Sequence, residues 1–473
     1  MQVLQASGKI LNSLSSTEIN MESTGLNSIE KKASLSLAAV FGMRMLGLFM
    51  ILPVFAIYGV QLDGYSPIWM GLAIGAYGFT QAVLQIPMGI LSDRIGRKKV
   101  IIGGLVVFCI GSVVAAMAES VYGVVFGRAL QGMGAIASAT LALAADLSRE
   151  EQRPKVMATI GMFIGLSFAV AMVLGPVLAK SYGLSGLFYF TAIMALVGVA
   201  IIVFIVPNSV NTAPKGDLVA APKRLKSLIK HPQLLRLNIG VFILHLSLTA
   251  MFVSLPILLT KVGFAVDDHW TLYLPALLIS FAIMVPFMIW AIKKNKQKLV
   301  FCGAILLMVL SLLALWQKHD NFYFMAMMVI LFFVAFNYLE ASMPSTLSQI
   351  APAGDKGSAM GVFSSSQFFG AFIGGLLGGV VQTYFDVATV FLFSASLLLV
   401  WYTFALGMEQ VKRSKSLSCS IEFTDEQHAK SIAKKLAKTP GIIESTLVYS
   451  ESVAYLKIDE SLIDRAKLKS ILS

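Results

Sequence analysis

Residues 89–100 read Gly-Ile-Leu-Ser-Asp-Arg-Ile-Gly-Arg-Lys-Lys-Val and lie between two long apolar runs. Seven of these residues hold one acid and four bases, which are Asp93, Arg94, Arg97, Lys98 and Lys99. Gly89 and Gly96 permit a sharp reversal of the chain, because glycine has no side chain to restrict its backbone. A short loop between apolar segments leaves few places for so many charges. Some of them must therefore pair with each other or with a neighbouring helix end.

The rest of the chain is too apolar for a soluble protein. Of its 473 residues, 57% are hydrophobic and only 13% are charged, whereas soluble domains are about 25% charged. We predict an all-α polytopic membrane protein with twelve transmembrane helices in two six-helix bundles. Each predicted segment is long enough to cross about 30 Å of hydrocarbon. The segments are residues 34–58, 68–91, 99–118, 121–147, 155–180, 184–206, 234–260, 268–292, 298–316, 321–350, 356–382 and 386–408.

The basic residues gather in alternate loops. A net charge of +12 could indicate a nucleic-acid partner, but this placement follows the positive-inside rule of membrane proteins instead. We therefore exclude nucleic acid and take the lipid bilayer as the partner of the apolar surface. The basic side, which we predict to be cytoplasmic together with both termini, carries Lys31, Lys32, Arg94–Lys99, Arg149, Arg153, Lys223–Lys230, Lys293–Lys298, Lys356 and Lys412–Lys415.

A long polar linker at residues 207–233 separates six apolar segments from the next six. Such a division is typical of transporters built from two bundles. We predict six parts: a disordered cytoplasmic arm (1–33), an N-terminal bundle (34–206), the cytoplasmic linker (207–233), a C-terminal bundle (234–408), a short linker (409–415) and a cytoplasmic domain (416–473).

The two predicted bundles contain a weak internal repeat. Proline, apolar residues and bases recur before the third and ninth segments, at Pro87 and Pro286. Asp93 in the first loop corresponds to Ile292 in the second, and Gly96 corresponds to Asn295. Duplication explains this pattern, although the positive-inside rule alone could also produce two similar basic loops.

Glycines recur at four-residue spacing within several segments. This spacing lets helix backbones approach closely. It indicates either static packing or surfaces that slide during a conformational change. The glycines are Gly71/Gly75, Gly123/Gly127, Gly161/Gly165 and Gly370/Gly374/Gly378.

Several ionisable or strongly polar residues lie inside apolar segments, where they are costly and usually functional. They are Arg44, Arg128 with Gln131, His245, and Glu340 with Asn337 one turn earlier. Across a central cavity, either arginine together with Glu340 could form a substrate or proton site. The alternative is a buried structural pair, or an arginine that binds backbone carbonyls. Glu340 is the best candidate for a proton carrier. Burial favours its protonated form and a nearby arginine favours its charged form, so a change in their balance could take up or release a proton. A lone histidine such as His245 is more often structural.

Three motifs resemble those of the major facilitator superfamily. Gly89-x-Leu91-x-Asp93-Arg94-x-Gly96-Arg97-Lys98 resembles motif A, and Arg128-x-x-Gln131-Gly132-x-Gly134 resembles motif B. Gly175-Pro176 resembles the end of motif C of the drug:proton antiporter branch, although Ala179 and Lys180 stand where that motif prefers glycine. The resemblance implies a proton-coupled exporter that alternates between inward- and outward-facing states in a bacterial inner membrane.

Motif A stabilises the outward-facing state in that superfamily. The resemblance places Asp93 at the N-terminus of the eleventh helix, near Lys356 and Gly357, where the positive end of the helix dipole attracts a carboxylate. Arg97 is expected to bridge Asp93 and Asp146. The alternative is that Asp93 and Arg97 only fasten the loop.

The last residues change in composition and predict a separate domain. An alternating strand at 417–423, a capped helix, strands at 442–449 and 452–458 and a final helix give the order β-α-β-β-α. This order is ferredoxin-like without the last strand and resembles the tail of YajR-type transporters. Only Cys419 stands near a metal-binding position, so we predict no metal or other cofactor. An unpaired sheet edge could bind a regulatory partner or a second copy, and a passive stabilising role is the alternative.

We therefore predict a secondary transporter that exports small amphipathic or drug-like compounds in exchange for protons. A proton symporter or facilitator for a metabolite is the alternative, as is a membrane sensor that signals through its tail. The sequence has no P-loop that would indicate a pump driven by ATP. It also has no soluble catalytic constellation, so we do not expect an enzyme.

Overall fold

The computed structural model describes residues 25–149, 152–207, 227–352 and 356–409 of the helical part. In the tail it describes residues 415–420, 431–432, 435–436, 439–448, 453–458 and 462–463. Residues 1–24 of the predicted N-terminal arm lie outside the described residues. So do residues 208–226 of the predicted linker, most of the first predicted tail helix and nearly all of the last one.

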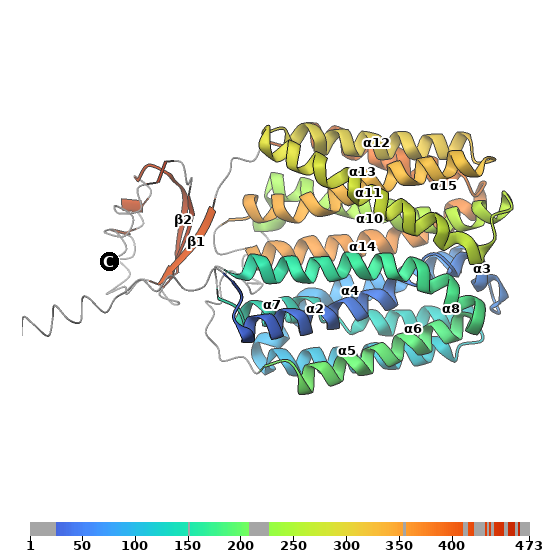
Figure 1. Cartoon of the computed structure of the whole chain (residues 1–473), viewed down its shortest axis with the longest axis horizontal. Helices are drawn as coiled ribbons and strands as arrows, with labels where there is room; N and C mark the ends of the chain where they lie inside the picture. The colour runs from blue at the N-terminus through green and yellow to red at the C-terminus, as the bar shows by residue number, and fades with distance from the viewer. Residues whose placement is uncertain are drawn as a thin grey trace, which may run out of the picture.

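The described helices of the first half form one bundle (Figure 1). They are α2 (Ser28–Phe49), α3 (Phe55–Tyr58), η1 (Gly59–Gln61), α4 (Pro67–Ile95), α5 (Arg97–Ala116), α6 (Val121–Met133), α7 (Ala137–Asp146) and α8 (Arg153–Phe204). The second half comprises α10 (Pro232–Lys261), η3 (Val266–Asp268), α11 (His269–Lys293), α12 (Gln297–Gln317), α13 (Phe322–Ile350), α14 (Lys356–Tyr384) and α15 (Thr389–Leu406).

Eleven helical stretches of the described chain are long and apolar enough to cross a membrane. One of them is α8, whose 52 residues would extend about 78 Å as a straight helix, more than twice the hydrocarbon thickness. Gly183 interrupts α8 with a φ of 64°, which glycine adopts without strain. Figure 1 shows the two halves of α8 running antiparallel. The structure therefore accommodates the twelve predicted crossings.

Two predicted segments are interrupted. The segment 121–147 is divided between α6 and α7, because residues 134–136 are not helical. At this break Gly134 lies so close to α5 that an added Cβ atom would meet the carbonyl oxygen of Gly104. The segment 34–58 is divided after α2, near Pro53, which has no backbone N–H to continue a helix.

The two halves make their closest backbone contacts along α4 and α14, which run antiparallel. A Cβ atom added to Gly71 would meet the carbonyl oxygen of Gly375, and one added to Gly75 would lie 2.7 Å from that of Phe372. On another face of α14, Gly370 and Gly374 abut the backbone of α10 at Phe242 and Leu246. For these glycines the structure shows that the four-residue spacing produces close packing.

We call the end of the bundle that holds residues 89–100 the motif A end, and the other the opposite end. One hydrophobic core joins both halves, and its first-half members, such as Met50, Val54 and Phe55, lie towards the opposite end. A separate core at the motif A end is built from buried first-half residues, including Leu37, Ile101, Leu143 and Ile202. The halves are thus held together mainly at the opposite end.

Each loop of the predicted internal repeat contains a residue with positive φ. Gly96 between α4 and α5 has a φ of 104°. Asn295, at the corresponding place between α11 and α12, has a φ of 53° and is the only non-glycine residue with positive φ in the described part of the chain. Asparagine tolerates this conformation better than most residues. The two connections differ in length, because one residue separates α4 from α5 and three separate α11 from α12.

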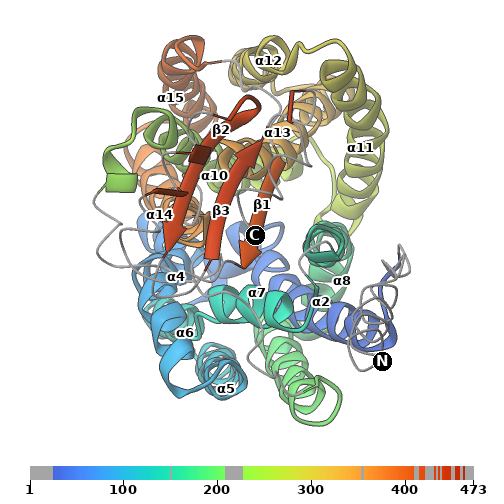
Figure 2. The same cartoon turned by 90° about the vertical axis from the view of Figure 1, so that its left-hand side faces the viewer.

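The tail contains a three-stranded antiparallel sheet in the order β1-β3-β2. Its strands are β1 (Lys415–Ser420), β2 (Ile442–Val448) and β3 (Val453–Ile458). Both outer strands pair antiparallel with β3, as the predicted ferredoxin-like order requires. Buried Ala454, Leu456 and Ile458 alternate along β3 and pack on Ile432 and Leu436. The sheet lies beyond the end of the bundle from which α2 starts (Figures 1 and 2).

Candidate functional site

Arg97 holds the motif A loop to the end of α7. Its guanidinium forms an ion pair with Asp93 one turn earlier, and its Nε lies 3.3 Å from Asp146 Oδ2. It also donates a hydrogen bond of 2.7 Å to Ser92 Oγ. The predicted bridge from Arg97 to both acids is present, and all of these contacts lie within the first half. Of the other residues in motif A, Arg94 is exposed, and Gly89 lies against Ser138 of α7.

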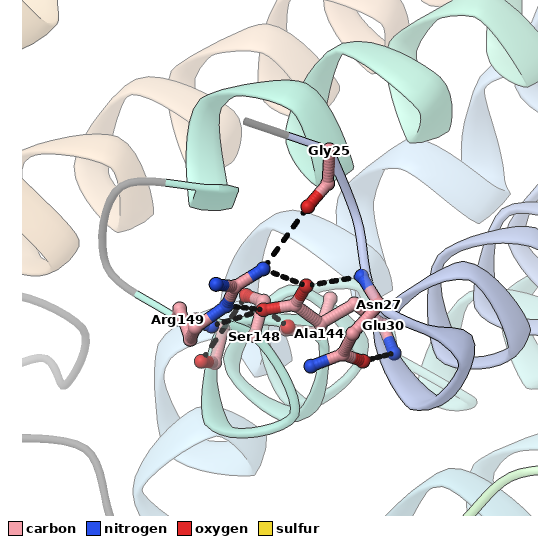
Figure 3. A network of polar contacts seen from close by, with 7 residues as sticks. Gly25, Asn27, Glu30, Ala144, Ser148 and Arg149 are labelled. Atoms are coloured by element: carbon pink, nitrogen blue, oxygen red, sulfur yellow. Dashed lines mark hydrogen bonds and ion pairs between the residues drawn. The ribbon is translucent and has the colours of Figure 1, made fainter. Parts of the chain in front are cut away.

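A second charged network lies at the same end, three residues beyond Asp146 (Figure 3). Arg149 donates from its backbone N and from Nε to Glu30 Oε1, each at 2.9 Å, and from Nη2 to Glu30 Oε2 at 3.0 Å. Glu30 and Asn27 also form a reciprocal capping box at the start of α2. Glu30 is only 2% exposed. This network fastens the start of α2 to the segment that carries Asp146.

Arg44 and Arg128 lie in the first half, and both are next to the fully buried Tyr77 on α4. The guanidinium carbon of Arg44 lies 5.5 Å from the centre of the Tyr77 ring, and that of Arg128 lies 5.3 Å from it. Arg128 donates to Gln131 Oε1 at 2.8 Å and to the backbone carbonyls of Ala73 and Ile74. Arg128 thus makes the carbonyl contacts that the sequence analysis named as the alternative to a functional role.

Glu340 is paired in the second half with different residues from those predicted. Its Oε2 lies 3.6 Å from His245 Nε2, and its Oε1 accepts a hydrogen bond of 3.1 Å from Gln367 Nε2. Gln367 Nε2 also lies 2.8 Å from His245 Nε2. Among the described residues, no ion pair joins Glu340 to Arg44 or Arg128. The polar cluster is therefore His245–Glu340–Gln367, from α10, α13 and α14.

The remaining candidate residues make local contacts. Asn337 donates a hydrogen bond of 2.7 Å to Ser280 Oγ of α11. It therefore does not share the partners of Glu340. Gln131 donates to Ser112 Oγ of α5 at 2.7 Å. Gly175, beside Pro176 in motif C, lies against the end of α2, where an added Cβ atom would be 2.6 Å from the Met50 carbonyl oxygen.

Sequence reasoning missed Gln81, Gln85 and Gln367. Gln81 and Gln85 are buried, and they continue the polar contact of Arg44 along α4. All three glutamines lie in apolar segments, where a buried amide also needs a hydrogen-bond partner, although its burial costs less than that of a charge. A search for buried amides as well as ionisable groups would have found them.

The comparisons with known proteins agree with this architecture. The family model of the Major Facilitator Superfamily matches residues 37–339 and 276–443. The crystal structure of the nucleoside transporter NupG superposes with a TM-score of 0.64 at 16% identity, covering 80% of this chain and 99% of that one. The chain belongs to the major facilitator superfamily and is a secondary transporter of small molecules in a membrane.

Two curated relatives place it within that superfamily. The inner membrane transport protein YajR of Escherichia coli (strain K12) is 44% identical over 443 residues, which cover 94% of this chain and 97% of that protein. Multidrug resistance protein 2 of Bacillus subtilis (strain 168) is 26% identical over 383 residues, which cover 78% of this chain and 92% of that protein. The resemblance in sequence thus extends over the helical part and into the tail.

Proposed function

We propose that this chain exports small amphipathic compounds in exchange for protons, with both termini in the cytoplasm. The observation that carries the proposal is the His245–Glu340–Gln367 cluster. It joins a carboxylate and an imidazole, two groups that can take up and release protons. The name of the Bacillus relative, a multidrug resistance protein, supports export of drug-like compounds.

The cluster connects three helices and is half-buried. The Glu340 side chain is 38% exposed and that of His245 is 13% exposed. Protonation of Glu340 would remove the charge that attracts His245 and would change the hydrogen bond with Gln367. Because these partners lie on α10 and α14, proton binding at Glu340 would alter the contacts between helices that pack against each other.

In this proposal the structure corresponds to the form that faces the cytoplasm, because the halves are joined mainly at the opposite end. Motif A then acts when the halves close at its own end, where Asp93 meets the N-terminus of α14. The antiparallel course of α4 and α14 supports this role, since it brings the start of α14 to the motif A end.

The proposal is tested by proton counterflux in proteoliposomes with an imposed pH gradient and a panel of drug-like cations, neutral compounds and acids. We expect substrate efflux to be accompanied by proton uptake in the wild type. Glu340→Gln should abolish this coupling, whereas Glu119→Gln, a matched change of an exposed carboxylate, should retain it. Coupling that survives Glu340→Gln would remove the carboxylate from the mechanism. Accumulation under the reversed gradient would favour symport over export.

A further inference from the structure

Arg44 is the buried charge that the contacts of the described residues leave incompletely satisfied. It lies on α2 and is 2% exposed. Its Nη2 donates to Gln81 Oε1 at 2.5 Å. Its Nε and Nη1 have no hydrogen-bond partner among the described residues. Arginine stays protonated in proteins. The site therefore contains a permanent positive charge whose Nε and Nη1 can still donate hydrogen bonds.

Arg128 provides an internal comparison, because it is just as buried and lies beside the same tyrosine. All three of its guanidinium nitrogens donate to oxygen atoms of the protein. Neither arginine forms an ion pair with a carboxylate of the described chain. The two arginines thus place two positive charges around Tyr77, and only Arg44 retains unpartnered N–H groups.

The aromatic rings around Arg44 offset only part of its charge. Its guanidinium carbon lies 5.5 Å from the centre of Tyr77 and 5.7 Å from that of Phe108. A ring face attracts a cation by about 0.5–2 kcal/mol, but it does not supply acceptors for N–H groups in the guanidinium plane. The Tyr77 hydroxyl is a further buried polar group without a partner among the described residues.

The surroundings of Arg44 have the composition of a site for an amphipathic anion. Gln81 continues the polar side through its hydrogen bond to Gln85, while Phe108 and Phe368 are apolar. Phe368, from α14 of the second half, lies 6.1 Å from Tyr77 between ring centres. A residue from the other bundle therefore packs against the tyrosine beside Arg44, as is expected of a substrate site between two moving halves.

We propose that Arg44, with Tyr77 and Gln81, binds the anionic group of the transported compound. A carboxylate, sulfonate or phosphate supplies the acceptor oxygens that the free guanidinium donors lack. Phe108 and Phe368 contact the apolar part of the compound. This inference rests on the proposed transport function and adds the charge of its substrate.

The experiment uses the full-length protein in nanodiscs of phosphatidylcholine, so that the bilayer carries no net negative charge. Thermal stabilisation is measured with 1-naphthoate, 1-naphthalenesulfonate and 1-naphthyl phosphate, each against its uncharged amide or ester. We expect at least one acid to stabilise the wild type more than its uncharged analogue. Arg44→Gln should weaken that binding about tenfold or more, as loss of a charge-assisted hydrogen bond does. Arg236→Gln, a matched change at a half-buried arginine of α10 that donates to the Gly407 carbonyl and not to the Arg44 site, should leave it unchanged.

Two further variants keep the result interpretable if Arg44→Gln is unstable. Arg44→Lys retains the charge and should retain the preference for the acid, and Tyr77→Phe retains the ring and should weaken it. Equal stabilisation by acid and uncharged analogue in all three pairs overturns the proposal, as does a preference that persists in Arg44→Gln. If phosphatidylglycerol stabilises the wild type but not Arg44→Gln, and its addition removes the preference for the acid, the site binds a lipid headgroup and the substrate role is overturned.

The same measurement separates this inference from the proposed proton coupling. Glu340→Gln should keep the anion preference, because Glu340 contacts His245 and Gln367 and not Arg44. Anion binding without proton counterflux would reject the coupling and leave the Arg44 site. Proton counterflux without any anion preference would reject the Arg44 site and leave the proton coupling.

Discussion

Lys180 Nζ of α8 lies 2.7 Å from Asp267 Oδ2 of η3, and this ion pair joins the two halves at the opposite end of the bundle. Lys180 stands where motif C prefers a glycine. The departure from the motif therefore has a structural counterpart, since a glycine could not reach across to Asp267.

Breaking this pair should weaken closure at the opposite end. The two side chains are 62% and 38% exposed, so solvent screens the attraction and the pair contributes little. We expect Lys180→Ala to shift the equilibrium between the two forms slightly towards opening at that end. Spin-label distances across the opposite end measure the shift. The charge reversal Lys180→Asp with Asp267→Lys should restore the wild-type distribution, and failure to restore it would show that the charge pair is not responsible.

The motif A contacts predict a shift at the other end. Asp93→Asn removes the charge that pairs with Arg97 and that we expect at the N-terminus of α14. The resting population should move towards the form that is open at the motif A end, as measured by spin-label distances there. Lys99→Ala is the matched control, because Lys99 is exposed. Lys98 is unsuitable, since its Nζ donates to the Val206 carbonyl. Unchanged distances in Asp93→Asn would contradict the conformational role of motif A.

The Glu30–Arg149 network predicts a loss of stability. Glu30→Gln leaves Arg149 without its buried carboxylate and should lower the free energy of unfolding by about 1.5–3 kcal/mol. The double variant with Arg149→Gln should cost less than the sum of the single changes, because both remove the same interaction. Thermal unfolding in detergent gives the comparison. Additive effects would mean that the two residues act separately.

The close contact of α4 and α14 predicts a steric effect. Gly71→Ala would place a methyl group against the Gly375 carbonyl, and overpacking of this kind costs about 1–3 kcal/mol. We expect a lower unfolding temperature or a population shifted towards separation of the opposite ends. Gly103→Ala is the control, because nothing lies within 4 Å of its added Cβ atom. A Gly71→Ala protein that is unchanged in both measurements would show that the contact relaxes at no cost.

Much of the fold follows from patterns within single segments. Apolar length predicts the crossings, and the resemblance to motif A implies the Arg97 contacts with Asp93 and Asp146. The break at residues 134–136 was not predicted, because it depends on the approach of α5 to Gly134. The predicted pairing of Glu340 with Arg44 or Arg128 was also wrong. Packing within the second half decides which helices face Glu340. The sequence does not show how far an arginine on another helix lies from this carboxylate.

Gln367 and Phe368 are consecutive residues of α14, yet Gln367 bonds to Glu340 and Phe368 packs on Tyr77. One helix therefore touches both the carboxylate of the second half and the arginine site of the first. Where the ligands of both sites prefer particular positions of α14, each changes the affinity of the other site by the same factor. Substitutions at Phe368 should then change the coupling between the two sites, while the hydrogen bond from Gln367 to Glu340 is kept.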